Sequence, residues 1–169
     1  MRTAARLFYQ NGYSNTGINQ IVEEAKIAKS SLYQHFRSKE DLLMAYLEET
    51  GTETLDLLKQ AADACEAPKD KILAIFNYLE KLMLNDDFYG CHFLNIVYEM
   101  PQEAVRVREQ VKKQKDSVRD LFREILKPIG KELLADEIYT LFEGALISNK
   151  VHGDPWPVAS ARNIAEKII

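Results

Sequence analysis

The residues best suited to chemistry lie in and just before the segment SLYQHFRSKEDL, residues 31–42. Leu32 and Phe36 are four residues apart, so they share one buried face of a short helix. The other positions carry amide, hydroxyl, imidazole or ammonium groups: Lys29, Ser30, Ser31, Tyr33, Gln34, His35 and Lys39. Such groups hydrogen-bond to base edges in the major groove and bind phosphates. The segment therefore predicts a helix whose exposed side contacts double-stranded DNA.

A second short helix is expected directly upstream of this segment. Ile18, Ile21, Val22 and Ala25 fall at relative positions 0, 3, 4 and 7, which is the spacing of one apolar helix face. Residues 26–28 then break the pattern. Two short helices joined by a tight turn form a helix-turn-helix, whose second helix fits the major groove.

The same part of the chain resembles the TetR family of bacterial one-component repressors. The family pattern runs LF-x-x-x-G-Y, then a Thr, then I-A-x-x-A-G-V-S-x-G-x-L-Y-x-H-F-x-x-K-E-x-L. The matching residues here are Leu7, Phe8, Gly12, Tyr13, Thr16, Ile21, Ala25, Leu32, Tyr33, His35, Phe36, Lys39, Glu40 and Leu42. The resemblance covers about residues 4–47. It implies an all-α fold of about nine helices, with a DNA-binding head at 1–47 and an effector-binding and dimerisation domain at 48–169.

Three positions depart from the family pattern. Lys26 replaces the usual turn Gly, and a left-handed backbone there costs a non-glycine residue roughly 1 kcal/mol. Ala28 replaces the Ser that usually caps the recognition helix, a loss of about 1 kcal/mol. Ser30 replaces a Gly, which is a small-for-small change. The first two predict a slightly looser recognition helix.

Base contacts are expected from the recognition helix itself. The Gln34 amide is the best candidate, since a Gln side chain bonds adenine through two hydrogen bonds. Lys29 is expected to reach a guanine or a phosphate. Ser30 and Ser31 are short enough to let the helix seat deeply in the groove.

Backbone contacts are implied by the family resemblance. Lys39 corresponds to a phosphate clamp, and Thr16 is expected to cap the second helix and touch a phosphate. Tyr33 and His35 correspond to residues that pack or bond against the DNA backbone. The alternative for Tyr33 and His35 is that they only support the fold of the head.

Composition places the chain among ordinary soluble proteins, with 46% hydrophobic and 28% charged residues. No run of about eighteen apolar residues and no signal-peptide core is present, so no membrane span is expected. The two cysteines, Cys65 and Cys91, fit a reducing cytoplasm better than a disulfide framework. The late start of the first helix and a final helix ending at Ile169 suggest a chain trimmed at both ends.

The charge of the chain is unevenly divided. The net charge is −4, yet residues 1–47 hold six basic and four acidic side chains, a net +2, which leaves −6 for the remainder. A mildly basic head on an acidic body keeps the attraction to phosphate local.

The remainder of the chain has the periodicity of successive helices, and no strand pattern or repeat is evident. Ser38 and Asp41 form a capping-box-like start for a helix that reaches about residue 64. Pro101 suits the first position of a later helix. The other expected elements are a helix around 72–83, a loop at 85–87, a helix at 88–99, a stop at 128–130, a helix around 134–145, a break at 152–157 and a final helix.

An effector site is implied for the second domain. The expected residues are Phe76, Leu79, Cys91, His92, Asn95, Tyr98, Phe122 and Phe142. Residues 90–99 resemble a G-C-x-F-x-N-x-x-x-E segment of one TetR subgroup, and polar groups in an apolar setting suggest a pocket. The alternative is that the aromatic residues form an ordinary core. No cofactor and no metal are expected, and the effector is a small molecule of unknown identity.

A homodimer is expected, since one small head buries too little surface to select a single site. The predicted interface residues are Leu141, Gly144, Ala145, Ser148 and Trp156. The small residues among them allow close helix approach, and the family resemblance implies a four-helix interface. For Trp156, simple loop packing is an equal alternative.

The sequence also suggests two alternative classes of function. Cys91, near a helix N-terminus and beside His92, suggests a thiol that senses oxidants or electrophiles, whereas a free cysteine is more often a buried apolar residue. In the second alternative, the head no longer binds DNA and the protein functions only through its ligand-binding domain. Catalysis is not expected, because no nucleophile elbow, phosphate loop or HExxH spacing is present.

Overall fold

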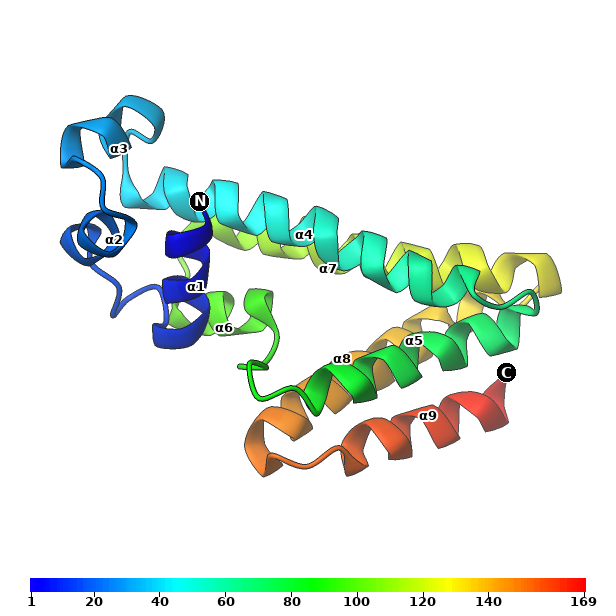
Figure 1. Cartoon of the computed structure of the whole chain (residues 1–169). Helices are drawn as coiled ribbons and strands as arrows, with labels where there is room; N and C mark the ends of the chain where they lie inside the picture. Colours follow the sequence, from blue (N-terminus) through cyan, green and yellow to red (C-terminus); the bar gives the residue numbers. More distant parts are fainter. The chain divides into compact units, whose positions relative to one another are not determined.

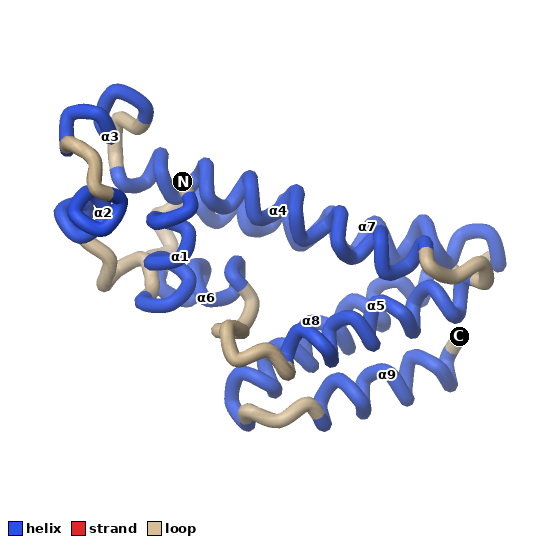
Figure 2. The backbone as a smooth tube through the Cα atoms, in the orientation of Figure 1, coloured by secondary structure: helices blue, strands red, loops and turns tan.

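The structure is a computed structural model that describes all 169 residues, and its regular elements are all helical (Figure 1, Figure 2). The nine-helix, all-α architecture expected from the family resemblance is confirmed. None of the helices is long and apolar enough to cross a membrane. The elements in order are α1 (Arg2–Asn11), α2 (Ile18–Ala25), α3 (Lys29–His35), α4 (Lys39–Asp63), α5 (Pro68–Met83), α6 (His92–Glu99), α7 (Val105–Leu126), the 3-10 helices η1 (Lys127–Ile129) and η2 (Glu132–Leu134), α8 (Ala135–His152) and α9 (Trp156–Ile168).

The chain divides into two compact units. Unit 1 consists of Met1–Thr52 together with His92–Lys112, and unit 2 consists of Glu53–Cys91 together with Lys113–Ile169. This division differs from the functional boundary at residue 47 that the sequence suggests. The physical reason is that α6, distant in sequence, stacks on α1 and hydrogen-bonds to the loop after α1 and to the first half of α4.

Unit 1 is built on the apolar faces of its first three helices. Leu7 and Phe8 of α1, Ile21 of α2 and Leu32 of α3 are all buried. The Phe8 ring packs against that of Tyr46 from α4, with ring centroids 5.8 Å apart. The periodicity that predicts the helix-turn-helix therefore marks the residues that form its core.

The turn between α2 and α3 is left-handed at the position where the family pattern has Gly. Lys26 adopts φ 54° and ψ 43°, the left-handed region, and its N–H bonds to the Glu23 and Val22 carbonyls. Ala28 stands at the N-cap of α3 without a side-chain hydrogen bond. Both departures from the family pattern thus leave the recognition helix with a strained entry and an uncapped first turn.

The start of α4 follows the predicted capping arrangement. The backbone N–H of Asp41 donates to Ser38 Oγ at 3.0 Å, and the helix continues to Asp63. This interaction satisfies one of the N–H groups left unpaired in the first turn of a helix.

Two predicted boundaries are wrong. α6 begins at His92 rather than near residue 88, because residues 88–91 lack helical hydrogen bonding. Pro101 does not open α7, which begins at Val105. The Pro101 carbonyl instead accepts hydrogen bonds from the N–H of Ala104 at 3.2 Å and from Nε of Arg108 at 3.2 Å, so the segment forms a turn.

Unit 2 is a helical bundle in which α9 packs against both α5 and α8 (Figure 1, Figure 2). Its core includes Ile75 and Phe76 of α5, Phe122 of α7 and Ile138 of α8, all fully or almost fully buried. The predicted stop after α7 is present as η1, which ends at Gly130 with φ 67°. The chain therefore reverses where proline and glycine predict it.

Candidate DNA interface and effector site

The recognition helix α3 exposes the side chains that the sequence selects for DNA. Lys29, Ser30, Tyr33, Gln34 and His35 are exposed, and Tyr33 retains 44% of its accessible surface. Ser31 is half-buried, whereas Leu32 is buried in the head. The helix thus offers donors, an amide and an aromatic edge on one accessible surface.

Lys29 links the two helices of the motif. Its Nζ donates to Asn19 Oδ1 at 3.0 Å, which joins the start of α3 to α2. Only one of the three ammonium donors is used in this bond, so the others remain suited to an acceptor on DNA.

Lys39 lies at the first position of α4 and contacts Tyr13. Its Nζ donates to the Tyr13 carbonyl at 2.6 Å and lies 4.1 Å from the centroid of the Tyr13 ring. Burial lowers the pKa of Lys39, and the negative charge of Glu99 acts in the opposite direction. The ammonium is therefore held in a defined place at the surface of unit 1.

Thr16 does not cap α2, contrary to the prediction from the sequence. Its hydroxyl lies 2.7 Å from the Gly12 carbonyl and 3.2 Å from the Leu7 carbonyl, and the side chain is fully buried. Gly17 instead occupies the N-cap of α2, with no side-chain cap bond. The hydroxyl closes the connection from α1 and is not available to a phosphate, because the backbone at the end of α1 supplies the nearer acceptors.

Glu99, the last residue of α6, contacts the DNA-binding head. This contact is not predicted from the sequence. Its carboxylate accepts the backbone N–H of Tyr13 at 3.2 Å and of Ser14 at 2.7 Å. These partners lie more than eighty residues away in sequence. Periodicity reports only local neighbours, so no pattern in the sequence signals this contact.

His92, expected in the effector site, belongs to unit 1. Its ring stacks on Tyr9 with centroids 3.7 Å apart, and its Nδ1 hydrogen-bonds to the Tyr46 hydroxyl. Burial lowers the pKa of His92 to about 4. The imidazole is therefore neutral near pH 7 and fastens the start of α6 to α1 and α4.

An aromatic cluster forms the centre of unit 2. Phe142 of α8 packs edge-on against Phe76 of α5 and Phe122 of α7, with ring centroids 6.1 Å and 5.6 Å apart. Leu79 is buried one turn beyond Phe76 on α5. Four of the residues expected in the effector site are thus part of one apolar core.

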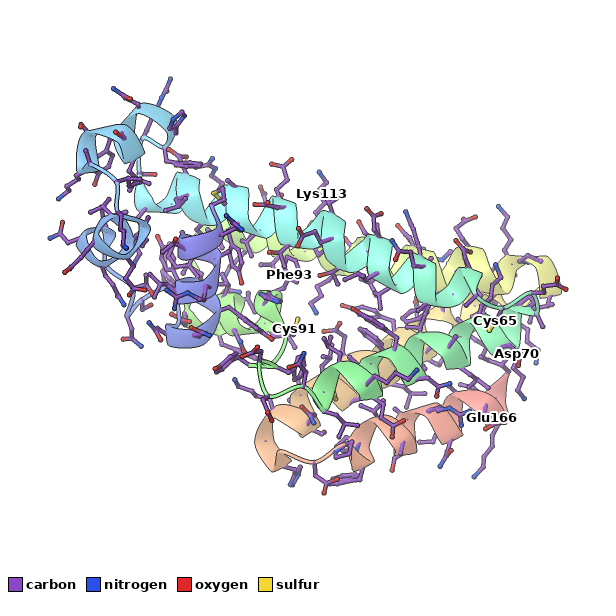
Figure 3. The ribbon with its side chains drawn as sticks, in the orientation of Figure 1. Cys65, Asp70, Cys91, Phe93, Lys113 and Glu166 are labelled. Atoms are coloured by element: carbon purple, nitrogen blue, oxygen red, sulfur yellow. The ribbon has the colours of Figure 1, made fainter.

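A polar cluster accompanies this core. Lys115 Nζ lies 3.2 Å from Cys91 Sγ and donates to both carboxylate oxygens of Glu143, at 2.9 Å and 2.8 Å. Figure 3 labels Cys91 in the segment that precedes α6. Burial lowers the pKa of Lys115, but the interactions of its ammonium with Cys91 and Glu143 together outweigh burial and raise it. Burial, with Glu143, also raises the pKa of Tyr139 to about 12. Lys115, Tyr139 and Glu143 are not among the residues that the sequence predicts for a site.

Comparison with known proteins identifies the head. Residues 1–46 match the family described as bacterial regulatory proteins, tetR family. The fold resembles that of SCO4454, a TetR-family transcriptional regulator from Streptomyces coelicolor, with a TM-score of 0.88 and 27% identity. That match covers 98% of this chain and 83% of SCO4454. Residues 1–46 therefore form a TetR-family head.

Two curated relatives are also similar over much of the chain. The HTH-type transcriptional regulator YuxN of Bacillus subtilis is 27% identical over 79% of this chain, which spans about half, 48%, of YuxN. The transcriptional regulator AcuR of Cereibacter sphaeroides is 28% identical over 89% of this chain and 74% of AcuR. Both relatives are named as regulators and not as enzymes.

The effector residues expected from the sequence are divided between the two units. Phe76, Leu79, Cys91, Phe122 and Phe142 belong to unit 2, whereas His92, Asn95 and Tyr98 belong to unit 1. Asn95 is half-buried, and Tyr98 is 71% exposed. The structure therefore brings together the unit 2 residues around Phe142, and it places Tyr98 at the surface of unit 1.

The predicted dimer residues differ in exposure. Gly144 is exposed, Leu141 and Ser148 are half-buried, and Trp156 is 50% exposed with its ring against His152. Ala145 is only 3% exposed, because it points into the core of unit 2. Ala145 is therefore not part of an accessible interface in this chain.

Two exposed apolar residues of α8 were missed by the sequence reasoning. Ile147 and Val151 are 40% and 74% exposed and lie three and seven residues after Gly144, on the same face of the helix. The spacing alone signals this face, but the search for small residues passed over them.

Proposed function

We propose that this chain is a sequence-specific transcriptional regulator that binds a palindromic operator as a homodimer. The observation that carries the proposal is the surface of α3, where Gln34, Tyr33 and Lys29 are exposed while Leu32 anchors the helix in the head. A helix of this kind in a TetR-type head reads the major groove. We also propose that the protein acts in the bacterial cytoplasm, where its DNA lies, and has no catalytic activity.

Different residues are proposed for sequence reading and for affinity. Gln34 reads a base, with Ser30 and Ser31 allowing close approach, whereas Lys39 and Lys29 bind phosphates. Gln34→Ala is expected to weaken binding by about 1–3 kcal/mol and to relax the preference at one base pair. Lys39→Ala is expected to weaken binding to all sequences and to lower the salt slope by about one.

The dimer is proposed to form through α8 and α9. Support comes from the exposed apolar residues Ile147 and Val151 of α8 and Trp156 and Ile164 of α9. Gly144 adds a position without a side chain, which permits close approach of helices. A two-fold axis through such a face would present two heads to the two half-sites of a palindrome.

Effector binding is proposed for the region around the aromatic cluster of unit 2. A small molecule that binds better to the form with low DNA affinity must weaken DNA binding by the same factor that DNA weakens its own binding. A coupling of about 1–3 kcal/mol is typical and suffices for regulation. Release from the operator then makes the protein a repressor, with α4, which contributes to both units, as the connecting helix.

Selection from random DNA duplexes tests the proposal. Purified protein is mixed with a random duplex library at two salt concentrations, and the bound sequences are read. Recovery of a palindrome with steep salt dependence supports a dimeric regulator, whereas salt-sensitive binding without an enriched sequence rejects sequence-specific recognition. Lys59→Ala serves as the charge control for Lys39→Ala, since Lys59 is an exposed lysine of the same helix.

A second candidate function is thiol sensing at Cys91. The contact between Cys91 Sγ and the Lys115 ammonium favours it, because a neighbouring cation stabilises the thiolate that reacts with electrophiles. His92, which the sequence suggested as the activating group, bonds to Tyr46 instead. Alkylation with iodoacetamide in a Cys65→Ser background tests this function. DNA affinity that stays unchanged after complete alkylation of Cys91 rejects it.

A further inference from the structure

The end of α6 is bonded to the loop between α1 and α2. The Glu99 carboxylate accepts two backbone N–H groups, from Tyr13 at 3.2 Å and from Ser14 at 2.7 Å. Hydrogen bonds to an ionised acceptor are stronger than neutral ones. Glu99 therefore holds this loop by its main chain, whatever the side chains of the loop do.

Gly12 makes room for this carboxylate. A Cβ atom at position 12 would lie 2.8 Å from Glu99 Oε1, which is closer than ordinary contact. The backbone of Gly12 also has φ 85°, a region that other residues rarely adopt. The close approach of Glu99 and the loop thus depends on glycine for two independent reasons.

Tyr13 is held from its other side by Lys39. The Lys39 ammonium donates to the Tyr13 carbonyl at 2.6 Å and lies 4.1 Å from its ring centroid. The Tyr13 N–H is bonded to Glu99, so one residue connects the two charged groups. The charge of Glu99 also favours the charged form of Lys39.

The other end of α6 is fastened as well. His92 stacks on Tyr9 of α1 and bonds to Tyr46 of α4. Because both ends of α6 are bonded to the head, α6 and the head constitute one body within unit 1.

We propose that Glu99 is a positioning residue for DNA binding, which fixes Tyr13 and thereby sets the Lys39 ammonium where a phosphate meets it. The inference rests on the proposed function, in which Lys39 binds the DNA backbone. Loss of Glu99 then weakens binding to every sequence equally, because no base contact changes. Glu99 therefore affects the strength of a phosphate contact and not the choice of operator.

Glu99→Gln in the full-length protein is the test variant. The amide keeps the size of the side chain but offers one acceptor oxygen in place of two, so one loop N–H loses its partner. Glu103→Gln is the matched control, since Glu103 is an exposed residue of unit 1 and the charge change is the same. The probe is the palindromic duplex recovered by selection, titrated by fluorescence anisotropy at several salt concentrations.

The expected result is binding that is roughly tenfold weaker, equivalent to about 1.4 kcal/mol. The salt slope should fall by about one for each lost phosphate contact, and the order of preference among duplexes should not change. Glu103→Gln should match the wild type. A role of Glu99 in fold stability alone would not reduce the salt slope, since all phosphate contacts would persist in the folded fraction.

A double-mutant cycle with Lys39→Ala decides whether Glu99 acts through Lys39. The effect of Glu99→Gln should vanish in the Lys39→Ala background, because the contact it positions is already gone. Hydrogen exchange at the Tyr13 and Ser14 amides should also accelerate in Glu99→Gln.

Two outcomes overturn the inference and one overturns the function on which it rests. Unchanged affinity and salt slope in Glu99→Gln reject a positioning role, as does a loss that adds fully to that of Lys39→Ala. If the wild-type protein binds no duplex at all, the proposed function fails. The two failures are therefore distinguished by the wild-type titration.

Discussion

The buried pair of Lys115 and Glu143 permits a sharp prediction about stability. The two side chains are each 14% exposed, and the ammonium bonds to both carboxylate oxygens. Removing one partner of a buried pair leaves an uncompensated charge, with a loss of about 3–5 kcal/mol. Because some water still reaches this pair, we expect the lower end, about 3 kcal/mol, for Lys115→Met or for Glu143→Leu.

The double variant should behave differently from either single one. With both charges gone, no unpaired charge remains, and apolar side chains of similar size fill the space. Replacement of a whole buried pair is often neutral or stabilising. We therefore expect Lys115→Met with Glu143→Leu to unfold within about 1 kcal/mol of the wild type.

Urea denaturation followed by circular dichroism measures these differences at one fixed protein concentration, since the stability of the proposed dimer depends on concentration. Lys71→Met is the matched control, because Lys71 pairs at 3.3 Å with Asp63, whose side chain is 74% exposed. That control should lose less than about 1 kcal/mol. The prediction would be refuted if either single variant lost no more unfolding free energy than the control. It would also be refuted if the double variant lost the sum of the two single losses.

Three further predictions concern unit 1, each measured as the free energy of unfolding in urea. The pKa of His92 is about 4 when folded against 6.5 for the free side chain, so the unfolded chain binds more protons between these values. The free energy of unfolding is then highest above pH 6.5 and falls by up to about 3 kcal/mol as the pH drops to 4. The variant His92→Gln should lack this pH-dependent loss. The same loss in His92→Gln would show that His92 is not its cause. Gly12→Ala should destabilise by about 1–3 kcal/mol through its positive φ and its approach to Glu99, and an unaltered midpoint would count against the close contact. Lys26→Gly should stabilise by about 1 kcal/mol by relieving a left-handed lysine, and Ala28→Ser by about 1 kcal/mol by capping α3. No gain in Lys26→Gly would contradict strain at that position, and no gain in Ala28→Ser would contradict the missing cap.

The parts of the structure that depend on near neighbours could be predicted from the sequence. The apolar spacing of α2, the turn at Lys26 and the Ser38 cap of α4 each involve residues within one or two turns. The family pattern extends over the same local segment. For that reason the head and the succession of nine helices were predicted well.

The remaining features depend on contacts between distant segments. Lys115 meets Cys91 and Glu143 across 24 and 28 residues, and Glu99 meets Ser14 across 85. No periodicity reports such pairs. Thr16 was misassigned for a related reason, since its buried hydroxyl bonds to the end of α1 rather than to the helix that follows it.

The discontinuity of unit 1 has a consequence for the modularity of the protein. A chimera that joins residues 1–47 to the second domain of another protein would separate Tyr9 and Tyr46 from His92. It would also separate Ser14, in the loop between α1 and α2, from Glu99. Chimeras built to change operator choice should therefore carry the residues of α6 that bond to the head. The full DNA affinity of the head is therefore expected to require a distant helix as well as the N-terminal segment.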